Sequence, residues 1–360
     1  MTARPASRAR RVAIVRLTSL GDVIHTLPVA AALKRDDSKT RVIWLAEERE
    51  RVVLDDNPVV DDVIAVPLRR WRAMARRPAE WRAANREFRD LRRTLRDLAI
   101  DAAIDVQGWP HKTSPLAWLS RAPLRIGFSR RFARHPLATL FTTVQVTPPP
   151  EARHIVDQNL ALLGALGIDA RTKPVEFPLP RFAEADAWAA EWWHAHGLED
   201  RRVVALLPST RGAAKLWSIG SFRAIARRFL EDPATVVVAL GGPGEERRLE
   251  DVIADFPPSR AIAVAPGPIP RLVGLLRRID LAIGNDTGPI HIAAASGVPC
   301  LGLFGPTRGD RNGPYGPLCS YVQSPTRSME DISVDVVWDA IRQMPAKPAG
   351  GAGRALSIPV

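Results

Sequence analysis

The chain has 360 residues, which favours two domains over a single hydrophobic core. Its hydrophobic fraction of 46% and charged fraction of 25% are typical of a globular protein and exclude a disordered or fibrous chain. The net charge is +12, and only six of the 51 basic residues are lysine, so arginine carries the excess. Arginine favours anionic partners such as phosphorylated ligands, an anionic membrane face or nucleic acid, although arginine-rich codon usage gives the same count.

The cysteine content and the amino-terminal residues indicate the compartment. Cys300 and Cys319 stand in no CxxC or metal-ligand spacing, so a disulfide framework is excluded and a reducing cytoplasm is expected. Residues 1–11 are basic, but Arg16 and Asp22 interrupt the apolar sequence that follows. We therefore predict neither a signal peptide nor a transmembrane helix.

The first half of the chain alternates short apolar runs with helical patterns. After a tail at residues 1–10 that we expect to be disordered, the strands are predicted at residues 12–15, 41–46, 63–66, 102–106 and 125–128, and the helices at 22–34, 81–98 and 154–166. Pro28 predicts a kink or an early break in the first helix. The arginines of the second helix are interpreted mainly as a solvated face.

The second half repeats this alternation. Strands are predicted at residues 203–207, 235–240, 261–264, 279–283 and 300–304, and helices at 185–196, 222–230, 289–296 and 334–343. The pattern predicts an α/β protein with two Rossmann-like parallel-sheet domains that face each other across a cleft. The domains are predicted at residues 11–174 and 185–345, with a proline-rich linker at 175–184 and a disordered tail at 346–360.

Two strand-to-helix turns stand out. Asp22 begins the helix after the first strand, where a carboxylate serves either as a helix cap or in function, and His25 lies one turn later on the same face. In the second half, Asp286 or Thr287 can cap the helix that starts near Pro289. Free amides at such a helix start form an anion site, although an ordinary capped helix has the same sequence.

Other polar residues also follow predicted strands, where open α/β sheets bind ligands. In the second half, hydroxyls, a lysine and a helix start are suited to bind a diphosphate, and a carboxylate near a glycine turn is suited to bind a ribose. The candidate residues for these contacts are Ser209, Thr210, Lys215, Glu245 and His291. The first half offers cations for a phosphate or a carboxylate, namely Arg69, Arg70, Arg72 and Lys112. The sequence has no GxxxxGK[ST], no GxGxxG after a strand and no GxSxG, so the usual ATPases, dehydrogenases and hydrolases are poorly supported.

Four motifs in one order carry a family resemblance over about residues 11–343. RLTSLGDVIHTLP, PLRRWR, LLPSTRGAAKLW and NDTGPIHIAAASGVPCLGLFGPT resemble the heptosyltransferases of glycosyltransferase family 9, which have a GT-B fold. Within that family, the RRWR segment is most similar to members that add the first heptose to the Kdo of the lipopolysaccharide inner core.

The resemblance implies inverting transfer of a heptose from ADP-L-glycero-D-manno-heptose to a Kdo or heptose acceptor, with no metal and no cofactor beyond the donor. Asp22 matches the general base. The donor-binding matches are Ser209, Thr210, Lys215, Glu245 (or its neighbour Glu246), Asp286, Thr287, Gly288 and His291. The acceptor-side positions are Arg69, Arg70, Arg72 and Lys112, with His25 beside them. The expected partners are the nucleotide sugar, an anionic glycolipid of the Kdo-lipid A type and the inner leaflet, with no nucleic acid.

The chain also departs from the family pattern. Ser209 stands where a threonine is common, and Arg308, Gly309 and Asp310 follow the GPT motif where an aspartate and a proline are common. Three alternatives therefore remain: a heptosyltransferase with a protein or another glycan as acceptor, a GT-B nucleotide-sugar epimerase, and a basic protein that binds nucleic acid or membrane without catalysis. The tryptophans at 188, 192 and 193 fit a helix core better than a base-stacking surface, which argues against nucleic acid.

Overall fold

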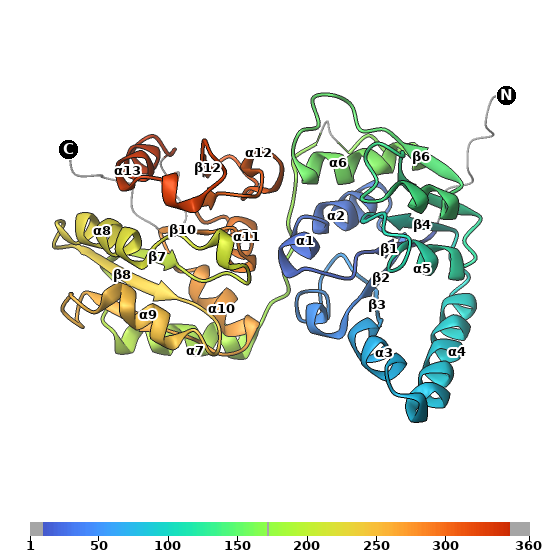
Figure 1. Ribbon diagram of the computed structural model, residues 1–360, viewed down its shortest axis with the longest axis horizontal. Coiled ribbons are helices and arrows are strands. Elements are labelled where there is room, and N and C mark those ends of the chain that lie inside the picture. The colour runs from blue at the N-terminus through green and yellow to red at the C-terminus, as the bar shows by residue number, and fades with distance from the viewer. Residues whose placement is uncertain (1–9, 171–172, 346–360) are drawn as a thin grey trace. The chain divides into compact units, whose positions relative to one another are not determined.

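The computed structural model describes residues 10–170 and 173–345 and divides into two compact units, Met1–Pro180 and Arg181–Val360 (Figure 1). Residues 1–9 of the predicted amino-terminal tail and the whole tail predicted at 346–360 lie outside the described residues. Arg10, the last residue of the predicted amino-terminal tail, is described, and its backbone N–H donates to Asp101 Oδ2 at 2.9 Å. Among the described residues, no helix combines the length and apolar character needed to cross a membrane.

The first unit is built on a parallel sheet in the order β3-β2-β1-β4-β5-β6. Its strands are β1 (Arg11–Val15), β2 (Arg41–Ala46), β3 (Asp62–Ala65), β4 (Ala102–Asp105), β5 (Leu124–Phe128) and β6 (Val144–Val146). The central strands β1, β2 and β4 are almost wholly buried, as expected for strands covered on both faces. The sequence analysis missed β6, which is a three-residue edge strand with no long apolar run.

The helices of the first unit depart from the sequence prediction in several places, and those at residues 68–75 and 114–119 are not among the predicted helices. The observed helices are α1 (Leu20–Ile24), α2 (Leu27–Asp36), α3 (Leu68–Ala75), α4 (Trp81–Asp97), α5 (Ser114–Leu119) and α6 (Ile155–Ala161). The single helix predicted at 22–34 is two helices, and the break that Pro28 predicts occurs before it, because proline is tolerated in the first turn of α2. The RRWR segment, predicted as a strand-end loop, lies within α3.

The second unit has the same topology as the first. Its parallel sheet has the order β12-β11-β10-β7-β8-β9. The strands are β7 (Arg202–Leu207), β8 (Thr235–Leu240), β9 (Ala261–Val264), β10 (Leu281–Asn285), β11 (Cys300–Phe304) and β12 (Cys319–Gln323). Counted from the first strand of each unit, both orders are 3-2-1-4-5-6, the doubly wound order that binds nucleotides. Five strands were predicted here, and the missed β12 is a half-exposed edge strand.

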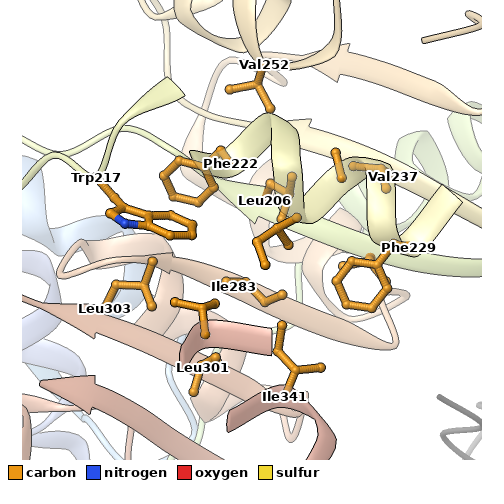
Figure 2. Packing of buried hydrophobic residues seen from close by; sticks show 14 of the residues in the cluster. Leu206, Trp217, Phe222, Phe229, Val237, Val252, Ile283, Leu301, Leu303 and Ile341 are labelled. Atoms are coloured by element: carbon orange, nitrogen blue, oxygen red, sulfur yellow. The ribbon is translucent and has the colours of Figure 1, made fainter. Parts of the chain in front are cut away.

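Helices cover the second sheet and enclose its core. They are α7 (Ala183–Ala195), α8 (Ile219–Leu230), α9 (Glu246–Ile253), α10 (Ile269–Leu276), α11 (Gly288–Ala295), α12 (Gly309–Asn312) and α13 (Val334–Arg342). Figure 2 shows Trp217 and Phe222 packed with strand residues such as Leu206 and Ile283. Of the three tryptophans of α7, only Trp193 is buried, so the prediction that all three are core residues is too broad.

Candidate functional site

The polar loops of the second unit meet where the strand order of its sheet reverses, between β7 and β10. In doubly wound sheets this point, at the carboxyl ends of the strands, is the usual ligand position. The loop after β7 carries Thr210 and Lys215, and the turn after β10 carries Asp286. The topology therefore brings together two segments that are about 70 residues apart in the sequence.

Asp286 is the centre of this cluster. Lys215 Nζ lies 2.6 Å from Asp286 Oδ2, and the hydroxyl of Thr307 donates to the same oxygen at 2.8 Å. His291 Nε2 lies 3.7 Å from Asp286 Oδ1, and the Thr210 hydroxyl donates to the backbone oxygen of Asp286 at 2.9 Å. Since the Asp286 side chain is only 13% exposed, it holds these groups from a mostly buried position.

The charge of Asp286 is fixed by its partners. Burial alone would raise the pKa of its carboxyl. His291 and then Lys215 lower this pKa, and together they outweigh the effect of burial. The pKa of Asp286 therefore lies far below its usual value, and the group is ionised at every physiological pH. An anion of this kind positions a cation and a hydroxyl, and it does not accept a proton in a reaction near pH 7.

Two further side chains fix both ends of the loop at residues 208–217. Asn285, fully buried at the end of β10, donates to Pro208 O at 2.7 Å and accepts from the backbone N–H of Trp217 at 3.0 Å. Arg248 donates to Pro208 O at 2.9 Å and to Trp217 O at 3.0 Å. Asn285, Arg248 and Thr307 are not among the site residues predicted from the sequence. An asparagine that ends a buried strand is the local signal that could have identified Asn285.

The remaining predicted donor residues differ in their surroundings. Ser209 is 93% buried, and its hydroxyl has no hydrogen-bond partner among the described residues. Thr287 is the N-cap residue of α11 but makes no side-chain cap bond, and Gly288 is the first residue of that helix. The hydroxyl of Thr287 and the first amides of α11 therefore stand at one helix start, where an anion is stabilised.

Glu245 and Glu246 both bind backbone amides of the glycine turn after β8. Glu245 Oε2 accepts from Gly242 N at 2.7 Å, and Glu246 Oε1 accepts from Gly244 N at 3.0 Å. A Cβ atom on Gly241 would lie 2.7 Å from Glu245 Oε2, so only glycine leaves room for this arrangement. Glu245 is the half-buried member of the pair, and Glu246 is exposed.

Asp22 lies at the corresponding reversal of the first sheet, after β1. It is the third residue of α1, not its N-cap, which is Ser19. Its Oδ2 atom accepts from both the backbone N–H and the hydroxyl of Ser19 at 3.0 Å, and Arg16 Nη2 lies 2.5 Å from its Oδ1 atom. The Arg16 side chain is buried and the Asp22 side chain is 36% exposed, so the carboxylate is oriented by the protein and still reaches solvent.

His25 has a different position from the one that the sequence pattern predicts. The residue is 4% exposed, and its ring lies edge-on against His154 with the ring centroids 5.2 Å apart. Its backbone oxygen accepts from Asn159 Nδ2 at 3.2 Å. The ring is therefore inside the first unit and not on the surface beside Asp22.

The basic residues predicted for the acceptor divide into two groups. Arg69 pairs with Glu47 at 2.9 Å, and Arg70 pairs with Glu87 of α4 at 3.0 Å. The pKa of Lys112 is lowered first by burial and then by Arg72 and Arg134. Arg72 thus lies near Lys112, and so does Glu47, the partner of Arg69, which raises the same pKa. Arg70 belongs to the contact between α3 and α4. We call Arg69, Arg72, Lys112 and Arg134 the basic cluster.

The loop that carries Lys112 is organised by two residues that the sequence analysis did not single out. Lys112 Nζ lies 3.7 Å from the centroid of the Trp109 ring, and the Arg134 guanidinium lies 4.3 Å from it. Asp105, at the end of β4, is fully buried and accepts from the Ser114 hydroxyl at 2.5 Å and from Gly108 N at 3.0 Å. Burial raises the pKa of the Asp105 carboxyl despite these hydrogen bonds.

Comparison with known proteins identifies the family of the chain. The model of glycosyltransferase family 9 (heptosyltransferase) matches residues 88–336. The chain belongs to this family. It is 29% identical to lipopolysaccharide heptosyltransferase 1 of Pseudomonas aeruginosa over 318 residues, which cover 85% of this chain and 81% of that one. It is 25% identical to lipopolysaccharide heptosyltransferase 1 of Escherichia coli K12, over 93% of this chain and all of that one.

Solved structures match the fold at lower identity. Escherichia coli heptosyltransferase WaaC with ADP gives a TM-score of 0.75 at 24% identity and covers 92% of this chain and 99% of that one. A family 9 glycosyltransferase from Veillonella parvula also gives a TM-score of 0.75, at 22% identity, and the match covers 94% of this chain and 98% of that one. These likenesses confirm the predicted GT-B architecture of this glycosyltransferase. The match to the family 9 model, which describes heptosyltransferases, decides against the epimerase alternative.

Two further features of the described ranges concern metal binding and cavities. They contain no group of three or more His, Cys, Asp or Glu side chains that could hold a metal ion. A cavity of about 360 Å³ is lined by Arg227, Asp255, Phe256 and Arg260 among others. It lies beside the amino ends of β8 and β9, the opposite edge of the sheet from the polar loops, and contains none of the candidate residues.

Proposed function

We propose that this heptosyltransferase transfers the heptose of ADP-L-glycero-D-manno-heptose to a Kdo sugar of the lipopolysaccharide inner core, with inversion at the anomeric carbon. The observation that carries the proposal is the Asp286 cluster at the strand reversal of a family 9 chain, since it arranges a lysine, two hydroxyls and a helix start where a diphosphate is bound. The names of the relatives, lipopolysaccharide heptosyltransferase 1, support the choice of heptose and of inner-core acceptor.

The donor residues act on the leaving ADP. Negative charge builds on the diphosphate as the glycosidic bond breaks, and Lys215 together with the amides at the start of α11 stabilises it. Asp286 keeps Lys215 in place and never takes the proton. Ser209, with a buried hydroxyl that has no partner in the described residues, supplies a further donor to a phosphate oxygen. Glu245 binds the nucleoside through its ribose hydroxyls.

The acceptor residues act on the sugar that receives the heptose. Asp22 removes the proton from the attacking hydroxyl, since its carboxylate is partly exposed and is held in one orientation by Ser19 and Arg16. The basic cluster binds the carboxylate of Kdo and the phosphates of the lipid, with Arg72 and Lys112 as the main cations. No metal or further cofactor takes part. The enzyme works in the cytoplasm, at the inner face of the membrane.

A single assay tests this function. Purified protein is incubated with ADP-heptose, with and without a Kdo-bearing acceptor, and ADP and glycan products are measured. We expect ADP release only in the presence of the acceptor, together with a heptosylated product. If no Kdo acceptor is modified but a protein or another glycan is heptosylated, the proposed acceptor is wrong. If heptose is transferred to none of these acceptors, the proposal is refuted.

A further inference from the structure

One stretch of the first unit has an unusual charge composition. Residues 106–150 contain six arginines or lysines and no aspartate or glutamate, although the chain as a whole has 39 acidic residues among 360. The stretch includes the loop after β4, helix α5, strand β5 and the short 3₁₀ helix η3 (Pro136–Phe141). A surface built from it therefore lacks the neutralising carboxylates found elsewhere on the protein.

Large apolar side chains project from this same stretch. Trp118 of α5 is 56% exposed, and Leu137 and Leu140 of η3 are 55% and 77% exposed. In a 3₁₀ helix, residues three apart lie on one side, so the two leucines point outward together. Helix α5 packs beside η3, which brings Trp118 to the same region. Leu140 is the most exposed large hydrophobic residue in the described part of the chain.

Exposed cations flank these apolar residues in the sequence. Arg121 lies two residues after the end of α5, and Arg130, Arg131 and Arg134 precede η3 in the turn at residues 129–135; all four are exposed. Within residues 10–170 and 173–345, no carboxylate forms an ion pair with any of them. On the neighbouring α3 and α4, in contrast, Arg70 is paired with Glu87. These arginines are thus available for an external anion.

We propose that Trp118, Leu137, Leu140 and these four arginines form a docking face that binds the surface of an anionic bilayer. Leucine and tryptophan side chains enter the boundary between head groups and acyl chains, and the arginines contact anionic head groups. A second copy of the chain does not fit, because a two-fold interface would bring two unneutralised positive faces together. Nucleic acid fits less well, because Trp118 is the single aromatic side chain among these seven residues and the two aliphatic leucines offer no stacking surface for bases.

The docking face is continuous with the basic cluster. Arg134 belongs to both, since its guanidinium lies over the Trp109 ring that also holds Lys112. A sugar anchored in the bilayer by its lipid would therefore be presented to Lys112 and Arg72 by the same contact that docks the enzyme. This inference rests on the proposed function for its acceptor, and it adds the surface by which the enzyme reaches a lipid-linked substrate.

Sedimentation with vesicles tests the docking face. The probe is vesicles of phosphatidylglycerol and phosphatidylethanolamine in equal parts, with pure phosphatidylcholine vesicles as the uncharged comparison. We expect the wild type to bind the anionic vesicles. L137S/L140S should bind them at least about tenfold more weakly, because two exposed apolar side chains are lost. R130S/R131S should also bind more weakly, and its binding should depend less on salt concentration. V336S, which changes a residue that is 52% exposed in the other unit, is the matched control and binds as wild type.

A second readout separates docking from catalysis. L137S/L140S should lose turnover with a Kdo acceptor embedded in vesicles and keep wild-type turnover with a deacylated, water-soluble form of the same acceptor. The docking face is overturned if this variant binds vesicles as well as the wild type does. It is equally overturned if the substitutions turn a dimer of the protein into a monomer in solution and leave vesicle binding unaltered. If binding depends on the leucines but the wild type heptosylates neither acceptor, the docking face stands and the proposed function fails.

Discussion

Asp22 in the first unit and Asp286 in the second follow central strands of sheets with the same strand order, yet their surroundings are opposite. Asp22 is 36% exposed and is oriented by Ser19 and Arg16 on one side. Asp286 is 13% exposed, and Lys215, Thr307 and His291 occupy its oxygens. Under the proposed mechanism, one topology serves two roles: the accessible carboxylate takes a proton, and the enclosed one with a depressed pKa organises its neighbours.

The largest expected effect comes from the accessible carboxylate. Asp22→Asn should lower kcat by about 10²- to 10⁴-fold, the usual contribution of a general base, and leave the affinity for ADP-heptose within about twofold of wild type. Steady-state kinetics and calorimetric titration of the donor measure the two quantities. Asp339→Asn, at an exposed position of α13, is the control and should change neither. Turnover of Asp22→Asn close to wild type would remove Asp22 from the role of base.

The second effect concerns the enclosed carboxylate and its cation. Lys215→Met should weaken ADP binding by about 10- to 100-fold, because a charge-assisted hydrogen bond to the diphosphate is lost. Lys34 pairs with Asp61 in the first unit at 2.7 Å, so Lys34→Met removes a comparable ion pair as the matched control. If Lys34→Met reduces donor affinity as much as Lys215→Met does, the Asp286 cluster is not the donor site.

A third prediction concerns the residue that fixes the donor loop. Asn285→Ala should destabilise the protein by about 1–3 kcal/mol, since it removes the acceptor of the Trp217 backbone N–H and one of the two donors to Pro208 O, and it should also weaken ADP binding. Asn159→Ala removes another fully buried asparagine, in the first unit, and serves as the comparison. Urea unfolding should show a loss in both variants. Reduced ADP affinity in both would mean that general destabilisation, and not the loop, is responsible.

The smallest effect is a shift in pH dependence on the acceptor side. Because burial, Arg72 and Arg134 lower the pKa of Lys112 from its ordinary value of 10.5, this lysine loses its charge at a lower pH than an exposed lysine does. The KM for an anionic acceptor should therefore rise a few-fold on the alkaline side. Lys112→Arg should move that rise to higher pH, because arginine stays protonated there. An identical alkaline profile in the two proteins would exclude Lys112 from acceptor binding.

Much of the fold is determined locally. The central strands β1, β2, β7 and β8 are continuous apolar runs, and the sequence predicts each of them within about one residue of its observed bounds. Edge strands such as β6 and β12 were missed because a half-exposed strand has no continuous apolar run to recognise. Pro28 and the left-handed Gly167, which ends the last helical segment of the first unit, also act within a few residues of themselves.

The candidate site required tertiary structure. The sequence by itself predicts Asp22, Lys215 and Asp286 as site residues, through local patterns at strand ends and through motifs that resemble those of the family. Only the fold decided that Lys215 and Thr307 meet at one oxygen of Asp286, that Arg70 turns toward Glu87 and that His25 is buried. The physical reason is that local patterns specify backbone conformation, whereas the partner of a charged or buried side chain depends on which distant segments the sheet order brings together.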